Sequence, residues 1–80
     1  MKIYVTQDDI DHGERDNCLN CPVARAIARA TGETVDVGGP VVNLHGQTLM
    51  LPSVVARFVS EFDNGMFVEP FSFEFNYEPH

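Results

Sequence analysis

The chain has 80 residues, 44% of them hydrophobic, and this length allows one small domain (1–80) with a thin core. Twelve acidic residues against five Lys and Arg give a formal net charge of −7, which repels phosphate backbones and anionic membranes. We therefore expect no direct nucleic-acid ligand and no membrane partner. A basic protein is the better electrostatic match, although an acidic surface also serves solubility alone.

The first six residues predict a short strand with one buried face, because Ile3 and Val5 alternate with more polar neighbours. The polar stretch 7–9 interrupts this pattern too early for the apolar region of a signal peptide. No segment reaches the roughly 20 apolar residues of a membrane span. These features predict a cytoplasmic protein, in which thiols stay reduced.

An acidic segment follows the first strand. Thr6 can cap a short helical turn there, and Gly13 ends it. The acids lack the spacing and the glycine of a calcium loop, so we interpret 8–12 as a solvated acidic turn. The candidate contact residues for a basic partner are the acids of this segment and of the loop after it: Asp8, Asp9, Asp11, Glu14 and Asp16.

The two cysteines, Cys18 and Cys21, have two residues between them and lie just before an alanine-rich helical pattern. Pro22 is tolerated only in the first turn of a helix, which makes Asn20 the expected cap. The helix then runs to Gly32 with Arg25 and Arg29 exposed. Its predicted buried face consists of Val23, Ala24, Ile27, Ala28 and Thr31.

The Cys18 and Cys21 pair allows three interpretations. Two thiolates are half of a tetrahedral zinc site, and the other ligands would come from His12, His45, His80 or Asp16, with His12 the most reachable. A thioredoxin-type redox motif is disfavoured, because a polar loop of more than ten residues separates Val5 from Cys18 and nearby acids raise thiol pKa values. We favour a structural role, with Cys21 packed at the helix start, Cys18 partly exposed, and no metal or other cofactor.

The second half of the chain predicts three short strands, a helix and a final strand. The runs 34–37, 40–44 and 47–50 indicate an antiparallel meander, with His45-Gly46 as a tight turn. Pro52 and Ser53 open a helix whose apolar stripe contains Val54, Val55, Phe58, Val59 and Phe62. Asn64-Gly65 ends it, and the last strand places Phe71, Phe73, Phe75 and Tyr77 on one face, which we expect to cover the helix stripe.

Together these elements predict an α+β fold, a small antiparallel or mixed sheet with two helices on one face in the order β-α-β-β-β-α-β. No glycine-rich phosphate loop and no nucleophile elbow occurs in the sequence. We therefore expect a binding protein, not an enzyme. A homodimer is also compatible with the sequence.

The stretches Thr6-Gln7-Asp8-Asp9-Ile10-Asp11-His12-Gly13 and Cys18-Leu19-Asn20-Cys21-Pro22-Val23-Ala24, and the close from Phe62 to Glu74, resemble small proteins encoded by phages of actinobacteria. The resemblance covers most of the chain. It implies a phage origin and an intracellular location in the host cell, and it brings no activity and no site residues.

Two classes of function follow. The first is a small phage protein that engages a host macromolecule, as an inhibitor of a defence or regulatory factor, through its acidic surface. The alternative is a small zinc- or thiol-dependent module built on Cys18 and Cys21.

Overall fold

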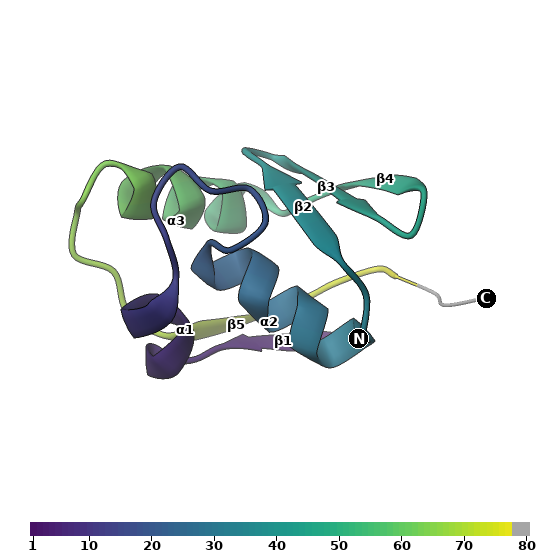
Figure 1. Cartoon of the computed structure of the whole chain (residues 1–80), viewed down its shortest axis with the longest axis horizontal. Helices are drawn as coiled ribbons and strands as arrows, with labels where there is room; N and C mark the ends of the chain where they lie inside the picture. Colours follow the sequence, from purple (N-terminus) through teal and green to yellow (C-terminus); the bar gives the residue numbers. More distant parts are fainter. Residues whose placement is uncertain (78–80) are drawn as a thin grey trace.

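The computed structural model describes residues 1–77 and shows an α+β fold with two antiparallel sheets and three helices (Figure 1). The predicted class is confirmed. The structure differs from the prediction in two details: the strands divide into two sheets, and the helical turn expected after Thr6 is a separate short helix in the order of elements. In chain order the elements are β1 (Lys2–Val5), α1 (Gln7–His12), α2 (Pro22–Thr31), β2 (Val35–Gly38), β3 (Val41–Leu44), β4 (Gln47–Met50), α3 (Ser53–Asp63) and β5 (Phe71–Glu74).

The first and last strands pair with each other. β1 and β5 run antiparallel, with Ile3 opposite Phe73 and Val5 opposite Phe71. The other sheet is the expected meander in the order β2-β3-β4. Its second turn uses His45 and Gly46 at φ 51° and 76°, the left-handed pair that a two-residue hairpin needs.

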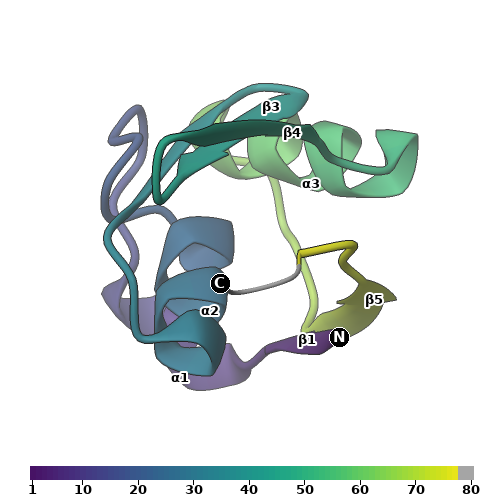
Figure 2. The same cartoon turned by 90° about the vertical axis from the view of Figure 1, so that its right-hand side faces the viewer.

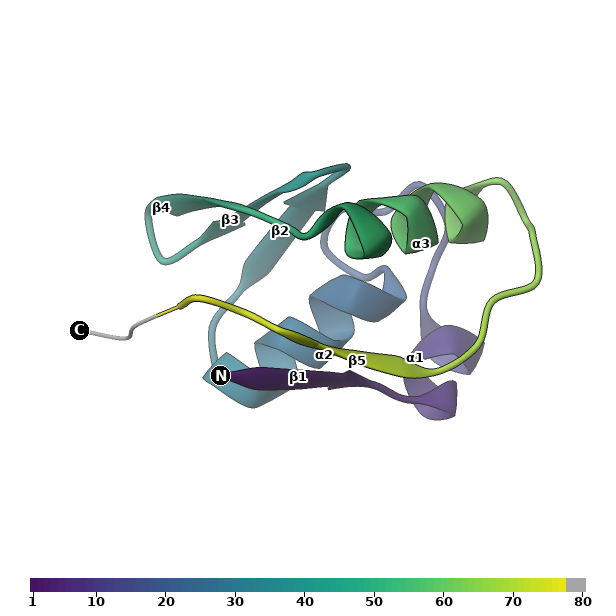
Figure 3. The ribbon, with the colours of Figure 1, turned by 180° about the vertical axis from the view of Figure 1, so that it is seen from behind.

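Helix α2 lies between the two sheets and contacts both β1 and β2 (Figures 1 and 3). Ala24 and Ala26 are buried on it, and such small side chains allow close approach of the strands. This position explains why the strands do not form one sheet with both helices on a single face. β1 and β2 thus pack on α2 from the two sheets, and five of its ten residues are buried.

Local signals set the ends of the helices. The Thr6 hydroxyl accepts from the Asp9 N–H and the Asp9 carboxylate accepts from the Thr6 N–H, which is a capping box at the start of α1. Helix α2 begins one residue later than predicted, because Pro22 occupies its first position and Cys21, not Asn20, is the N-cap. Gly32, at φ 74°, ends α2 as predicted.

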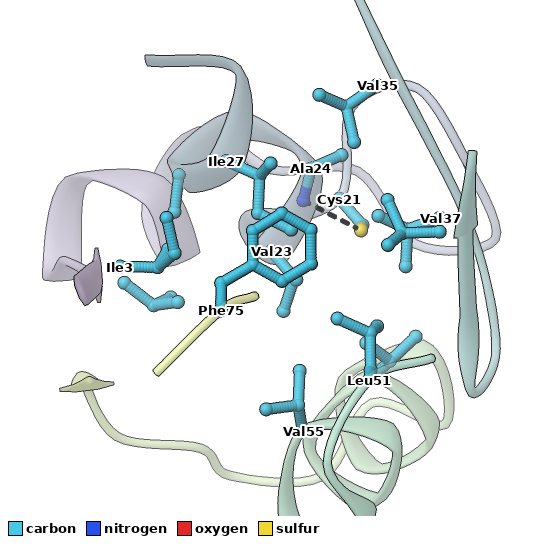
Figure 4. Packing of buried hydrophobic residues seen from close by; sticks show 14 of the residues in the cluster. Ile3, Cys21, Val23, Ala24, Ile27, Val35, Val37, Leu51, Val55 and Phe75 are labelled. Carbon is cyan, nitrogen blue, oxygen red and sulfur yellow. Dashed lines mark hydrogen bonds between the residues drawn. The ribbon is translucent and has the colours of Figure 1, made fainter. Parts of the chain in front are cut away.

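The core joins α2, α3 and the aromatic residues of the last strand (Figure 4). Four of the five predicted stripe residues on α3 are buried; the exception is Val54, which is 52% exposed. Phe58 stacks on Phe62 at 6.5 Å between ring centroids and contacts Phe71 at 4.7 Å. The aromatic face of the last strand therefore packs on the α3 stripe, as predicted.

We expect the substitution Phe58→Ala to destabilise the protein by about 3 to 5 kcal/mol, because it removes a buried ring and leaves a cavity. Urea unfolding followed by circular dichroism measures this. Val54→Ala is the matched control on the exposed side of the same helix and should change the free energy of unfolding by less than about 0.5 kcal/mol. An unchanged Phe58→Ala midpoint would show that this ring is not part of the core.

Candidate functional site

Asp9 is fully buried and forms the most extensive polar contacts of the acidic segment. Its two carboxylate oxygens accept hydrogen bonds from Nη1 and Nη2 of Arg29 at 2.7 and 2.8 Å, and the Thr6 N–H donates to it at 2.9 Å. The prediction that Asp9 belongs to a solvated turn and contacts a partner is therefore wrong. Its position in α1 directs the side chain toward α2, where Arg29 supplies the matching fork of donors.

The environment of Asp9 keeps its carboxylate charged. Burial by itself raises its pKa, but the hydrogen bonds from Arg29 and Thr6 outweigh this effect and lower the pKa below its ordinary value of 3.8. The same hydrogen bond raises the pKa of Arg29. Arg29 is half-exposed, in line with the prediction, but it also donates to the Tyr4 carbonyl at 2.9 Å and so joins α2 to α1 and β1.

Asp8 and Asp11 lie on the outer side of α1 and are exposed, as predicted. Asp8 has two partly exposed ion-pair partners, His12 at 3.1 Å and Arg25 at 3.6 Å. Asp11 accepts a hydrogen bond from Gln7 within the helix at 2.9 Å. Exposed pairs of this kind contribute little to stability, so both carboxylates remain available to a partner.

Glu14 and Asp16 are also exposed, and both shape the loop before α2. Glu14 accepts side-chain hydrogen bonds from Asn17 and Asn20, at 3.2 and 2.9 Å. Asp16 adopts φ 54°, and its N–H donates to the carboxylate of Asp63 at the end of α3. The fold thus brings Asp63 beside the predicted acids, a contact across 47 residues that no local pattern indicates.

The two cysteines have separate roles. Cys21 is buried among Ala24, Val35 and Val37, and its Sγ accepts from the Ala24 N–H at 3.4 Å (Figure 4). Burial raises the pKa of this thiol. Cys18 is exposed, and its carbonyl accepts from the Val37 N–H, which ties the loop to the edge of β2. The structural interpretation of the pair is confirmed in this respect.

Both cysteines line a hollow of about 190 Å³ together with Asp16 and Asp63. Within residues 1–77, however, no group of three or more His, Cys, Asp or Glu side chains is placed to hold a metal ion. His12 lies against Asp8 and His45 against Glu33, at 3.1 and 3.3 Å, both away from the thiols. The remaining candidate ligand, His80, lies outside the described residues.

An exposed apolar segment lies beside α1 and was not predicted. Met66 and Phe67, in the connection from α3 to β5, are 56% and 85% exposed. With Gln7 and Ile10 of α1 they border a hollow of about 260 Å³ that also contains the Arg15 side chain. The only sequence signal was a Met-Phe pair after Gly65, in a stretch where loop residues are usually polar.

Comparisons of the chain with protein-family models, with curated proteins and with solved structures found no match. In the part of the chain that the structure describes, no helix has the length and apolar character that crossing a membrane requires.

Loss of the Asp9 charge should destabilise the protein in acid. Because the folded-state pKa of Asp9 is depressed, its stabilising contribution is complete above the unfolded pKa of about 4 and is lost as pH falls through the folded value. We expect Asp9→Asn to lower the free energy of unfolding by about 1.5 to 3 kcal/mol at neutral pH and to flatten its decline below pH ~4. Asp11→Asn, on the exposed side of α1, is the control and should do neither. An Asp9→Asn protein with the wild-type acid profile would contradict this role.

The two thiols should differ in reactivity. We expect a disulfide reagent such as Ellman's to label Cys18 rapidly in the native protein and Cys21 only after unfolding, because Cys21 is buried and its pKa is raised. Cys18→Ser should abolish the fast phase. Elemental analysis should find no stoichiometric zinc. About one zinc ion per chain, with stability lost on chelation, would instead favour the metal module.

Proposed function

We propose that this chain is a small phage-encoded binding protein that engages a basic host protein, as an inhibitor of a defence or regulatory factor. The proposed contact surface, here called the α1 face, comprises Asp8, Asp11, Met66 and Phe67. The resemblance described above supports the phage setting. The physical argument depends on the α1 face.

The exposure of Phe67 carries the proposal. A phenylalanine that is 85% exposed, next to a methionine at 56%, costs solubility and contributes nothing to the core. Aromatic residues and methionine are enriched at the centres of protein interfaces, where they fill or border pockets on the partner. The hollow between Phe67 and Ile10 offers the complementary feature, a place for an apolar side chain of that partner.

The acids beside this apolar centre favour a basic partner. Asp11 accepts a hydrogen bond from Gln7, which lines the same hollow, whereas Asp8 lies on the side of α1 toward α2, where it pairs with Arg25. Arg15 also lines the hollow, so the acids border it on the α1 side only. In transient complexes, rim charges of this kind speed encounter and the apolar contacts slow dissociation. Asp9 is not part of the α1 face, because its carboxylate is buried and paired with Arg29.

The alternative function, a zinc- or thiol-dependent module, has less support. The Sγ of Cys21 is already an acceptor at the start of α2, and burial opposes formation of the thiolate that binds metals or attacks disulfides.

The test is co-purification of the tagged protein from lysate of an actinobacterial host, followed by kinetics with the isolated partner. We expect Asp11→Lys to slow association several-fold and to reduce its salt dependence, because rim charges act on encounter. Phe67→Ala should speed dissociation by about tenfold or more. Both variants should retain the wild-type free energy of unfolding.

Matched control substitutions lie on the β2-β3-β4 sheet, away from the α1 face. Asp36→Lys makes the same charge change on the exposed side of β2, and Met50→Ala removes a side chain that is 72% exposed on β4. Neither should alter the kinetics. If Asp11→Lys and Phe67→Ala leave binding as these controls do, the α1 face is not the contact surface.

A further inference from the structure

The two-stranded sheet has an open edge on β5. Met1 and Phe75 exchange two backbone hydrogen bonds, at 3.0 and 2.8 Å, and in an antiparallel pair such bonded positions alternate. This alternation implies that Ile3 exchanges backbone hydrogen bonds with Phe73, and Val5 with Phe71. The N–H and C=O groups of Ser72 and Glu74 therefore point away from β1, and within residues 1–77 no hydrogen bond to them is found.

The equivalent edge of β1 is closed, whereas that of β5 is not. The Tyr4 carbonyl, which points away from β5, accepts from Arg29 of α2. Figure 2 looks nearly along the strands. In this view β5 lies on the side of the two-stranded sheet that is farther from α2, with α3 above it. An open edge that presents unpaired backbone groups is a template for another extended chain.

A hollow of about 320 Å³ lies between α3 and the start of β5. Its apolar wall consists of Val54, Phe58, Pro70 and Phe71. Val54 is half-exposed although it belongs to the α3 stripe. In a strand, side chains alternate between the two faces. A chain paired with β5 would therefore turn every second side chain toward α3 and this hollow.

The hollow carries more negative than positive charge. Glu61 and Glu69 line it, whereas Arg57 is the single cation among its lining residues in the described chain. Glu74, on the outer face of β5, is paired with the N-terminal ammonium at 3.7 Å. A chain with basic residues between its apolar ones matches this pattern. A second copy of this protein fits poorly, because each copy carries a formal net charge of −7.

We propose that the β5 edge binds an extended segment of another protein, with alternating apolar and basic side chains, by addition of a strand to the β1–β5 sheet. The main chain of that segment pairs with Ser72 and Glu74, and its apolar side chains enter the hollow under α3. This inference goes beyond the proposed function, since it concerns a surface separate from the α1 face and a defined mode of recognition.

The test uses the full chain and a synthetic probe, the peptide acetyl-Lys-Val-Lys-Val-Lys-Val-Lys-amide, at up to about 1 mM. Amide hydrogen exchange by NMR is the readout. We expect exchange of the Ser72 and Glu74 amides to slow by about tenfold or more at saturation. The outward amides of Thr48 and Met50 on the β4 edge are the internal control and should not change.

Variants of the peptide separate backbone pairing from charge attraction. Two further peptides are N-methylated, one at the odd and one at the even positions. Only one of these two sets of N–H groups pairs with β5, so we expect one peptide to lose binding and the other to keep it. A Glu-Val peptide of the same length should not bind. On the protein, Ser72→Pro should weaken binding at least about fivefold with β1 pairing intact, since the lost N–H points outward, and Ser72→Ala should not.

Several results would overturn the proposal. These are no binding at the highest peptide concentration, equal binding of both N-methylated peptides, and protection on β4 instead of β5. Concentration-dependent protection of Ser72 and Glu74 without peptide would assign the edge to a second copy. Should Ser72→Pro not fold, the peptide series with the wild-type protein decides the question.

Discussion

The ion pair between the buried Asp9 and the half-exposed Arg29 is the interaction on which the arrangement of the first half of the chain depends. One guanidinium holds the carboxylate of α1 and the carbonyl of Tyr4 at the end of β1, so three elements meet at a single side chain of α2. A buried carboxylate without such a partner would be strongly destabilising. This pair fixes the orientation of α1, and with it the side of that helix that meets solvent. Asp8 and Asp11 are exposed because Asp9 is not.

The same packing leaves surfaces unpartnered elsewhere. Helix α2 lies between the two sheets and Arg29 covers the outer edge of β1 at Tyr4, while the edge of β5 that points away from β1 stays open. The long connection from α3 to β5 leaves Met66 and Phe67 exposed beside α1. In a chain of 80 residues the core is too small to cover every apolar side chain and every edge. Both proposed binding surfaces arise from this shortage.

Much of the local structure could be predicted from the sequence. The Thr6 cap, the stop at Gly32 and the tight turn at His45-Gly46 follow from interactions within a few residues, and the structure has each of them. The α3 stripe and the alternating aromatic residues of the last strand were also correct, because the periods of helix and strand are properties of the backbone. The exposed Cys18 and buried Cys21 followed from where Pro22 lets a helix begin.

Tertiary structure decided what depends on distant partners. An aspartate in an acidic turn looks solvated unless one knows that Arg29, 20 residues away, faces it. The division of the strands into two sheets follows from the position of α2, and the pairing of β1 with β5 joins the ends of the described chain. Composition and the hydrophobic periodicity of the sequence were enough to predict which segments form helices and strands. Packing between elements decided which charges are buried and whether the β5 edge stays open, since burial depends on the neighbours that the whole chain supplies.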